Sequence, residues 1–314
     1  MVVIELKDIS KSYDEIVALS RFNMRVKTGS ITGFVGPNGA GKSTTLRIIT
    51  GLARTDEGTA RLFGIDPYDN PRVKARFGFV SEHDDLYTWA SVEESVKLLS
   101  RLSRPLKRGI TSDVDMAISS VGMSKFKERL VSQLSKGMRQ RVKIAAALVH
   151  NPELLILDEP MGGLDPLGRR TIMNLLKQLN REEGVTVLVS SHVLEELENY
   201  VDRVTLIHRG QTLAEGNPDK IRSFIYTYPH EIIYRARKPA MAKINSQVVK
   251  HEDLLRSLSL HIIDDDILEC RIVTQNPERF YDELVRISVE ENSPILSVDT
   301  QSESVEKLFE FLVS

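Results

Sequence analysis

Apolar and polar positions alternate through the first part of the chain, as they do in strands that bury one face. The alternation predicts an antiparallel sheet that begins the fold, and a helix from Ser43 to about Gly51 interrupts it. Glu82 lies at the end of the last strand of this region. The strands of this sheet are expected at residues 2–9, 22–30 and 31–36, and two further strands are expected at residues 58–65 and 76–82.

From about residue 84 to residue 151 the pattern becomes helical. A first helix is indicated by apolar residues that fall on one helical face, namely Val92, Val96, Leu99 and Leu102. A second helix is expected at about 113–121. A third is expected in the run "VKIAAALV", directly after the segment "LSKGMRQR" of residues 134–141.

Two short runs within "ELLILDEP" and "GVTVLVSSH" are apolar throughout, which is typical of parallel strands covered on both faces. A predicted helix at residues 166–183 joins them into a β-α-β unit. Residues 1–222 are therefore predicted to form an α/β domain with a mixed sheet and a helical subdomain at about residues 84–151.

A second pattern begins after residue 222 and predicts a smaller domain over residues 223–314. Its elements are expected as a strand at 231–238, a helix at 240–258, a hairpin at 258–274 that turns at Asp264 to Asp266, a helix at 276–291, a strand at 294–300 and a helix at 304–314. This order is close to β-α-β-β-α-β, which predicts an α+β domain of the ferredoxin-like kind.

Composition adds few constraints on partners. The 314 residues are 41% apolar and 27% charged, as in ordinary folded proteins, and the net charge is -2. Residues 224–314 are acidic, with 10 Lys or Arg against 16 Asp or Glu. Because nucleic-acid binders present a concentrated basic face, no nucleic-acid partner is expected.

The cellular setting follows from cysteine usage and hydropathy. Cys270 is the single cysteine, which excludes an intramolecular disulfide and fits a reducing compartment. Its strand-like surroundings predict a packed thiol rather than a reactive one. No apolar stretch approaches the roughly 20 residues of a membrane-spanning helix, and Glu5 and Lys7 interrupt the N-terminus. A cytoplasmic protein is expected.

The segment "GPNGAGKST" fits the phosphate-binding pattern G-x-x-x-x-G-K-[ST]. It follows a predicted strand and opens a predicted helix, which is the context that the motif requires. Its lysine would contact the β- and γ-phosphates of a nucleotide, and the hydroxyl after it would ligate Mg²⁺. The candidate nucleotide-binding residues are Gly36, Pro37, Asn38, Gly39, Ala40, Gly41, Lys42, Ser43 and Thr44.

The segment "LLILDEP" supplies carboxylates at the end of a buried strand. Asp158 is placed to hold the Mg²⁺ ion, and Glu159 is placed to polarise a water for attack on the γ-phosphate. Beside the phosphate loop, this interpretation is favoured over an ordinary acidic turn.

The segment "LSKGMRQR" has the features of a helix start, with Ser135 before Gly137 and good helix formers after them. A helix start carries free N–H groups and can hold an anion. The residues alone do not explain why one chain should carry two anion sites.

Taken in order, these motifs resemble those of the nucleotide-binding subunits of ABC transporters, and the resemblance covers residues 1 to about 222. The matching segments are "SKSY", "GPNGAGKST", "LSKGMRQR", "LLILDEP", "GGLDP" and "SSH". The resemblance implies an ATPase fold, with ATP and Mg²⁺ as cofactors. It also implies that Tyr13 stacks on adenine and that His192 contacts the γ-phosphate. From the residues alone, both would be taken as structural.

The resemblance further implies a homodimer that encloses two ATP molecules. Ser135, Lys136, Gly137 and the loop of Asp165 would then contact the ATP held by the partner chain. Integral-membrane permease subunits would be the second kind of partner, and they would hold the protein at the inner face of the cell membrane.

Several positions depart from the family pattern. Lys136 replaces a glycine of the usual LSGGQ segment and Met138 replaces its glutamine, while Met161 and Gly162 replace two hydroxyl residues before "GLD". Glu82 stands where many members have a glutamine, and its carboxylate would still ligate Mg²⁺. The segments "FVSEH" and "LSKGM" look most like those of exporter ATPases whose ABC-2-type permeases are separate polypeptides.

Other readings remain open at this point. One is a soluble ABC ATPase that acts on nucleic acid or the ribosome, and another is a P-loop kinase. The histidines at 83, 150, 208, 230, 251 and 261 show no metal-ligand spacing. Trp89 is either an exposed anchor for a permease or a buried residue at the edge of the helical subdomain.

Overall fold

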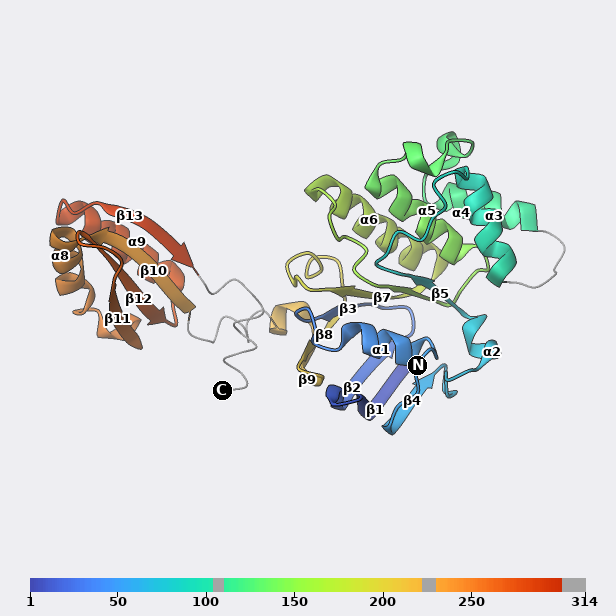
Figure 1. Cartoon of the computed structure of the whole chain (residues 1–314), viewed down its shortest axis with the longest axis horizontal. Helices are drawn as coiled ribbons and strands as arrows, with labels where there is room; N and C mark the ends of the chain where they lie inside the picture. Colours follow the sequence, from blue (N-terminus) through green and yellow to red (C-terminus); the bar gives the residue numbers. More distant parts are fainter. Residues whose placement is uncertain (104–109, 222–229, 301–314) are drawn as a thin grey trace. The chain divides into compact units, whose positions relative to one another are not determined.

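The structure is a computed structural model that describes residues 1–103, 110–221 and 230–300 (Figure 1). The chain divides into two compact units, Met1–Pro218 and Asp219–Ser314. Each unit has its own buried apolar cluster. The first unit contains every residue expected at the nucleotide site.

A three-stranded antiparallel sheet begins the first unit, with the order β2-β1-β4. Alternate residues of its central strand, such as Ile4 and Leu6, are buried, as the alternating pattern predicts. The strands are β1 (Val2–Tyr13), β2 (Ile16–Lys27) and β4 (Glu57–Leu62).

A six-stranded mixed sheet forms the centre of this unit, with the order β5-β6-β7-β3-β8-β9. The first five strands in this order are parallel, and β9 is antiparallel to β8. The strands are β3 (Ile31–Val35), β5 (Phe77–Val80), β6 (Leu154–Leu157), β7 (Thr186–Ser191), β8 (Arg203–His208) and β9 (Gln211–Gly216).

The expectation that residues 31–36 continue the first antiparallel sheet is wrong. The strand β3 lies between β7 and β8 and is parallel to both. All five of its residues are buried, because helices cover both faces of a central parallel strand. The strand β8 is an apolar run of the same kind that the sequence interpretation missed.

Helices cover the six-stranded sheet on both faces (Figure 1). On one face, α1 packs in a core shared with the three-stranded sheet. On the other face lie the helices of the predicted subdomain together with α6. The helices are α1 (Lys42–Ile49), the short α2 (Pro71–Lys74), α3 (Val92–Ser103), α4 (Ile110–Ser120), α5 (Lys136–Leu148) and α6 (Pro166–Glu183), with 3-10 turns at Ser124–Phe126 and Val131–Gln133.

The second unit follows the expected β-α-β-β-α-β order, with one antiparallel sheet in the order β11-β12-β10-β13. Cys270 is buried in its core, as predicted for a packed thiol. The elements are β10 (His230–Arg237), α8 (Lys238–Val248), a 3-10 turn (Glu252–Leu254), β11 (Ser257–Ile262), β12 (Ile267–Thr274), α9 (Pro277–Glu290) and β13 (Ile295–Thr300). The helix expected at 304–314 lies outside the described residues.

The helix expected at residues 240–258 is too long. It ends at Val248, and Leu254 is buried in the 3-10 turn that follows. From Ser257 onward the chain pairs with β12. Local spacing is compatible with a longer helix, but only a strand at this position satisfies the backbone groups along the edge of β12.

Candidate functional site

The strand order brings the predicted nucleotide residues to one edge of the six-stranded sheet. The phosphate loop follows β3, Asp158 and Glu159 follow β6, and His192 follows β7, which lies between those two strands. Glu82 follows β5, the neighbour of β6. Because parallel strands end at the same edge, residues far apart in the sequence converge there.

Two glycines allow the phosphate loop to lie close to its neighbours. A Cβ atom at Gly36 would come within 2.3 Å of the carbonyl oxygen of Ile207. At Gly41, which has a φ of +106°, it would come within 2.7 Å of the carbonyl oxygen of Ala18. Only glycine avoids both contacts, so the loop turns directly into α1, where phosphate oxygens can approach its backbone N–H groups.

The amine of Lys42 lies inside this loop, and the residue is only 6% exposed. Its Nζ donates to the carbonyl oxygens of Gly36 at 2.6 Å and Pro37 at 3.2 Å. The same nitrogen lies 3.3 Å from Oε1 of Glu159. The lysine charge is therefore concentrated where phosphate oxygens would enter, and a carboxylate compensates it.

Glu159 joins the phosphate loop to the predicted switch histidine. Its Oε2 lies 2.9 Å from Nδ1 of His192, while Oε1 faces Lys42. The residue has a φ of +45°, a left-handed conformation that is unfavourable for a side chain of this size. This conformation turns the carboxylate back over the phosphate loop, where a base for an attacking water is required.

Asp158 is the buried member of the carboxylate group, at 9% exposure. Burial raises the pKa of Asp158 above its ordinary value. A hydrogen bond from Ser190 opposes this rise, the charges of Glu159 and Glu82 add to it, and Lys42 opposes it. Asp158 therefore lies within the electrostatic reach of two other carboxylates.

Ser190, on β7, holds both acidic residues and was missed in the sequence interpretation. Its hydroxyl donates to Oδ1 of Asp158 at 2.6 Å and accepts from the backbone N–H of Glu159 at 2.9 Å. The signal that could have found it is a hydroxyl residue at the end of an otherwise apolar buried strand.

These residues fit an Mg²⁺ ion that is shared with a nucleotide. Within the described residues, no three His, Cys, Asp or Glu side chains gather into a metal site. Mg²⁺ needs no such cluster, because it is usually held by one or two carboxylates together with phosphate oxygens and water. Asp158, Glu82 and the exposed hydroxyl residue Ser43 supply such a set, and a cation would relieve the charge repulsion at Asp158.

The residues expected to act in trans start two helices. Ser135 is the N-cap of α5, and its Oγ accepts from the N–H of Met138 at 3.3 Å. Asp165 is the N-cap of α6, and its Oδ1 accepts from the N–H of Gly168 at 2.9 Å. Both residues are exposed. The hydroxyl hydrogen of Ser135 is not used by this cap, so it can be donated to a ligand.

Lys136 brings these two helix starts together. A Cβ atom at Gly163 would lie 2.4 Å from its Nζ, so the lysine side chain covers the loop that precedes Asp165. Gly137, next along, is half-buried. Among the described residues, no hydrogen bond or ion pair links Ser135, Lys136, Gly137 or Asp165 to the phosphate loop of the same chain.

Tyr13 lies at the end of β1 and its ring is 40% exposed. The Nζ of Lys11 is 5.4 Å from the ring centroid. No contact in the described chain joins this ring to the phosphate loop, so adenine stacking by Tyr13 stays a prediction.

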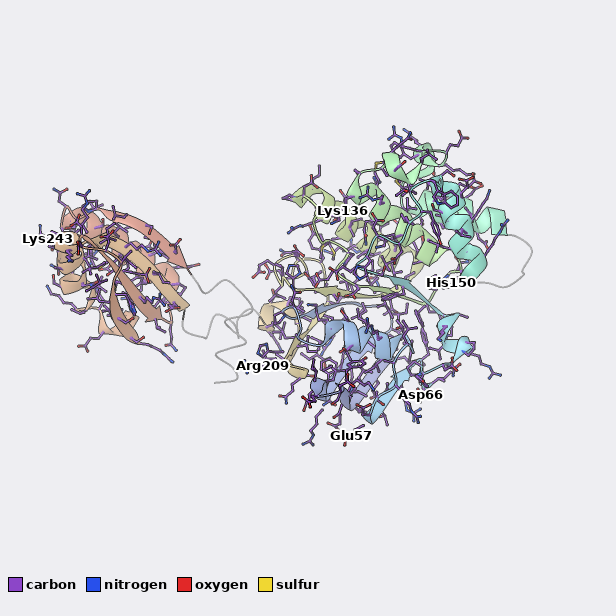
Figure 2. The ribbon with its side chains drawn as sticks, viewed as in Figure 1. Glu57, Asp66, Lys136, His150, Arg209 and Lys243 are labelled. Carbon is purple, nitrogen blue, oxygen red and sulfur yellow. The ribbon has the colours of Figure 1, made fainter. Side chains whose placement is uncertain are left out.

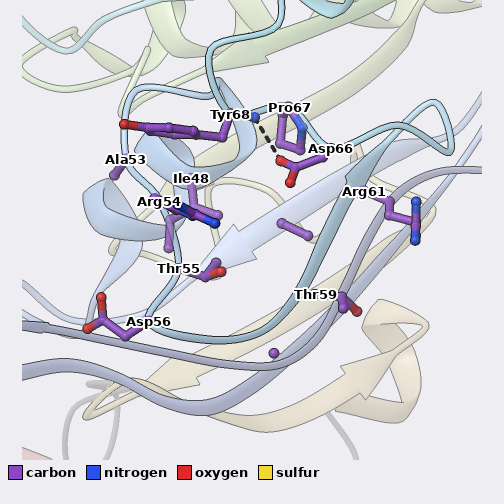
Figure 3. A pocket seen from close by; sticks show the side chains of 12 residues that line it. Ile48, Ala53, Arg54, Thr55, Asp56, Thr59, Arg61, Asp66, Pro67 and Tyr68 are labelled. Carbon is purple, nitrogen blue, oxygen red and sulfur yellow. Dashed lines mark hydrogen bonds between the residues drawn. The ribbon is translucent and has the colours of Figure 1, made fainter.

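A cavity of about 260 Å³ lies away from these residues, at the end of α1 and beside β4 (Figure 3). The guanidinium of Arg54 lies 5.9 Å from the ring centroid of Tyr68, and the N–H of Tyr68 donates to Asp66 at 2.9 Å. None of the predicted nucleotide residues lines this cavity, so it is not part of the nucleotide site.

Trp89 is 69% exposed, so the alternative of a buried tryptophan is wrong. Its ring lies 5.5 Å from that of Tyr87, which is also exposed. None of the described helices combines the length and the apolar character needed to cross a membrane.

Comparisons with known protein families match this geometry. A family model described as ABC transporter matches residues 19–162. A second model, described as AAA domain, putative AbiEii toxin, Type IV TA system, matches residues 127–198.

Two curated relatives extend the match. The chain is 38% identical over 216 residues to the bacitracin transport ATP-binding protein BcrA of Enterococcus faecalis, which is 68% of this chain and 69% of that protein. It is 34% identical over 251 residues to the sulfate/thiosulfate import ATP-binding protein CysA of Mycobacterium tuberculosis, covering 80% and 70% of the two chains.

Solved structures agree with these relatives. cbiO1 from Clostridium perfringens, part of the ABC transporter complex cbiONQ, superposes with a TM-score of 0.66 at 30% identity, covering 71% of this chain and 91% of that one. The dimeric structure of the bacterial ABC transporter cassette MJ0796 superposes with a TM-score of 0.61 at 30% identity, covering 68% of this chain and 98% of that one. The chain therefore belongs to the ABC transporter family of ATP-binding proteins.

Proposed function

We propose that this chain is an ATP-hydrolysing subunit that dimerises around two ATP molecules and powers a separate membrane permease. The observation that carries the proposal is the position of Glu159, whose two carboxylate oxygens face Lys42 and His192 at the end of the phosphate loop. The proposed base thereby contacts both the lysine that would bind the phosphates and the proposed switch residue.

Nucleotide binding would change the partners of Lys42. Its amine is now held by two backbone carbonyls and by Glu159. The β- and γ-phosphates offer the amine stronger charge-assisted bonds, which would release Oε1 of Glu159. That oxygen could then accept a proton from a water aligned with the γ-phosphate, while His192 keeps the carboxylate oriented.

Asp158, Glu82 and Ser43 would hold Mg²⁺, which neutralises the charge that develops on the β- and γ-phosphate oxygens. Ser190 keeps Asp158 in place for this contact. Removing Mg²⁺ with a chelator is therefore expected to abolish hydrolysis.

The second copy would complete each ATP site. Ser135 and Gly137 lie at an exposed helix start, and the serine hydroxyl hydrogen is available for a γ-phosphate oxygen. A relative of 30% identity is described as a dimer, which supports this arrangement. The phosphate loop of one chain forms no hydrogen bond with the Ser135 and Gly137 donors of that chain within the described residues. The dimer would therefore close only when ATP is bound between the two chains.

A cavity of about 720 Å³ in the first unit is a candidate seat for the permease. Its lining includes Phe79 of β5, Leu99 of α3 and Leu86 of the segment between these two elements. The exposed Tyr87 and Trp89 follow Leu86 directly, and aromatic anchors of this kind are enriched at protein interfaces. A short apolar helix of a permease fits such a groove.

We assign the direction of transport as export and the location as the cytoplasmic face of the cell membrane, through the permease. Support for export comes from "FVSEH" and "LSKGM" and from similarity to a bacitracin transport protein. A sulfate/thiosulfate import protein is similar at lower identity, so the direction needs a transport assay on vesicles that contain the permease.

Substitution of Glu159 by Gln tests the core of this proposal. The variant is expected to bind ATP, to hydrolyse it about 100-fold more slowly because the base is lost, and to accumulate as a dimer with ATP in size-exclusion chromatography. His192→Ala serves as a comparison that keeps the carboxylate. Wild-type hydrolysis by the Glu159→Gln variant would remove Glu159 from the role of base.

Substitution of Ser135 by Arg tests the contribution in trans. The larger side chain at the start of α5 is expected to block the ATP-dependent dimer while the monomer still binds ATP with unchanged affinity. Dimer formation is measured by light scattering with and without ATP, in the Glu159→Gln background. An undiminished dimer would refute the role of this helix start.

A further inference from the structure

Two cations of α5 hold the segment that carries Glu82. The Nζ of Lys143 donates to the carbonyl oxygen of Ser81 at 2.5 Å and also to that of His83. One helical turn earlier, Nε of Arg139 donates to Oδ2 of Asp84 at 2.6 Å. The two anchors lie four residues apart on the same face of α5, and together they contact three residues of the segment 81–84.

The bonding of Lys143 is unusual for a lysine. The residue is 8% exposed, and among the described residues it forms no ion pair within 4 Å. Burial lowers the pKa of its amine, which the charges of Asp85 and Asp84 partly oppose. A buried amine that binds backbone carbonyls instead of a carboxylate is positioned to fix the path of the main chain.

Glu82 lies between the two carbonyls that Lys143 holds. The strand β5, which ends two residues before Glu82, pairs in parallel with β6, which ends just before Asp158, and the N–H of Asp158 donates to the carbonyl oxygen of Val80 at 2.9 Å. The charge of Glu82 is also among the causes that raise the pKa of Asp158. The anchored segment thus brings a second carboxylate toward the buried one, although Glu82 itself is exposed and its side chain forms no hydrogen bond with the other residues that the structure describes. Its position depends on the main chain on either side.

The helix that supplies these anchors also carries the predicted in-trans residues. It runs from Lys136, after the cap Ser135, to Leu148, two residues before His150 (Figure 2). Because a helix is a rigid element, a displacement at the Ser135 end would be transmitted to Lys143.

We propose that Lys143 is a positioning residue for Glu82: by holding the carbonyls on both sides of it, Lys143 sets the Glu82 carboxylate beside Asp158 for Mg²⁺ and ties it to the movement of α5. This inference rests on the proposed function, since it names how the same ATP site is assembled. Lys143 thereby links the Ser135 end of α5 to the residues that would hold Mg²⁺.

The first experiment compares wild type with Lys143→Met, which keeps the length of the side chain without its donors. Mn²⁺ binding to the protein loaded with a non-hydrolysable ATP analogue is measured by electron paramagnetic resonance, beside the kcat and KM for ATP. Loss of an outer-shell partner is expected to weaken Mn²⁺ binding and to lower kcat by about tenfold each. Nucleotide affinity without metal is expected to stay unchanged.

The same substitution in a Glu82→Ala background separates positioning from a general structural role. With no carboxylate left to position, Lys143→Met is expected to have no further effect on Mn²⁺ binding or kcat. Lys177→Met is the matched control, because Nζ of Lys177 on α6 also donates to a backbone carbonyl oxygen, that of Asn199 at 2.8 Å, in a segment that carries none of the predicted Mg²⁺ ligands.

An equal loss in both backgrounds, or unchanged Mn²⁺ binding in Lys143→Met, would overturn the proposal. If Lys143→Met does not fold, Asp84→Asn loosens the same segment from its exposed end. It is expected to weaken Mn²⁺ binding about two- to threefold, and unchanged binding there would equally overturn the proposal. Absence of Mg²⁺-dependent hydrolysis by wild type would instead contradict the proposed function.

Discussion

At the scale of single residues, the site combines unfavourable local conformations with compensating contacts. Glu159 adopts a left-handed backbone conformation that a glycine would adopt without strain. Only a carboxylate in that position reaches both Lys42 and His192. The hydrogen bond from the N–H of Glu159 to Ser190 helps to retain this conformation.

Substitution of Ser190 by Ala is predicted to lower kcat by about tenfold with little change in KM for ATP. The variant loses the donor to Asp158 and the acceptor for the N–H of Glu159, while the phosphate loop is untouched. Steady-state ATPase kinetics measure both constants. Thr205→Val, which removes a buried hydroxyl from the neighbouring part of the same sheet, is the control. A change in KM alone would contradict this role.

At the scale of elements, helix starts and strand pairs follow local chemistry more closely than sheet membership does. Ser135 and Asp165 cap α5 and α6, as their residue types predict.

In the second unit, Glu269 on β12 lies directly opposite Arg235 on β10. Its carboxylate is 4% exposed and accepts from Nε of Arg235 and Nε of Arg271, both at 2.9 Å.

Substitution of Glu269 by Gln is predicted to lower the free energy of unfolding of the second unit by about 1 kcal/mol at pH 7. Hydrogen bonds from Arg235 and Arg271 hold the pKa of Glu269 below its ordinary value of 4.5. A lowered folded-state pKa contributes stability that is present above 4.5 and is lost as the pH falls through the lowered value. The difference between variant and wild type should therefore disappear in acid.

Urea unfolding, followed by hydrogen exchange of the β10 and β12 amides at pH 7 and at pH 3, measures this difference. Asp265→Asn, a change in the exposed hairpin turn, is the control and is expected to leave stability unchanged at both pH values. A loss of the same size at pH 7 and at pH 3 would assign the effect to packing rather than to the charged pair.

At the scale of the whole molecule, two separate cores define two units that can unfold independently. All of the nucleotide residues and the 720 Å³ cavity belong to Met1–Pro218. The acidic second unit contributes none of the predicted nucleotide residues.

A chain of residues 1–223 is predicted to bind ATP with the affinity of the full chain, within about twofold, because all of the predicted nucleotide residues belong to the first unit. Isothermal titration with ATP and Mg²⁺ measures this affinity, and calorimetric unfolding should show one transition fewer than the full chain. A tenfold loss of affinity would mean that the second unit supports the site directly.

The sequence by itself determined the local elements and the residue types of the site. The phosphate loop, Asp158, Glu159 and the helix starts at Ser135 and Asp165 depend on short-range spacing, which is readable along the chain. So does the β-α-β-β-α-β order of the second unit, although the spacing placed the end of α8 ten residues too late.

Only the tertiary structure decided how these parts meet. The strand β3 lies between β7 and β8, and Glu159 contacts both Lys42 and His192. Ser190 bonds to both acidic residues, and Lys143 holds the segment of Glu82. All of these contacts join residues that are distant in sequence. The physical reason is that strand order and helix packing are set by long-range burial and pairing, to which no local pattern of apolar and polar positions corresponds.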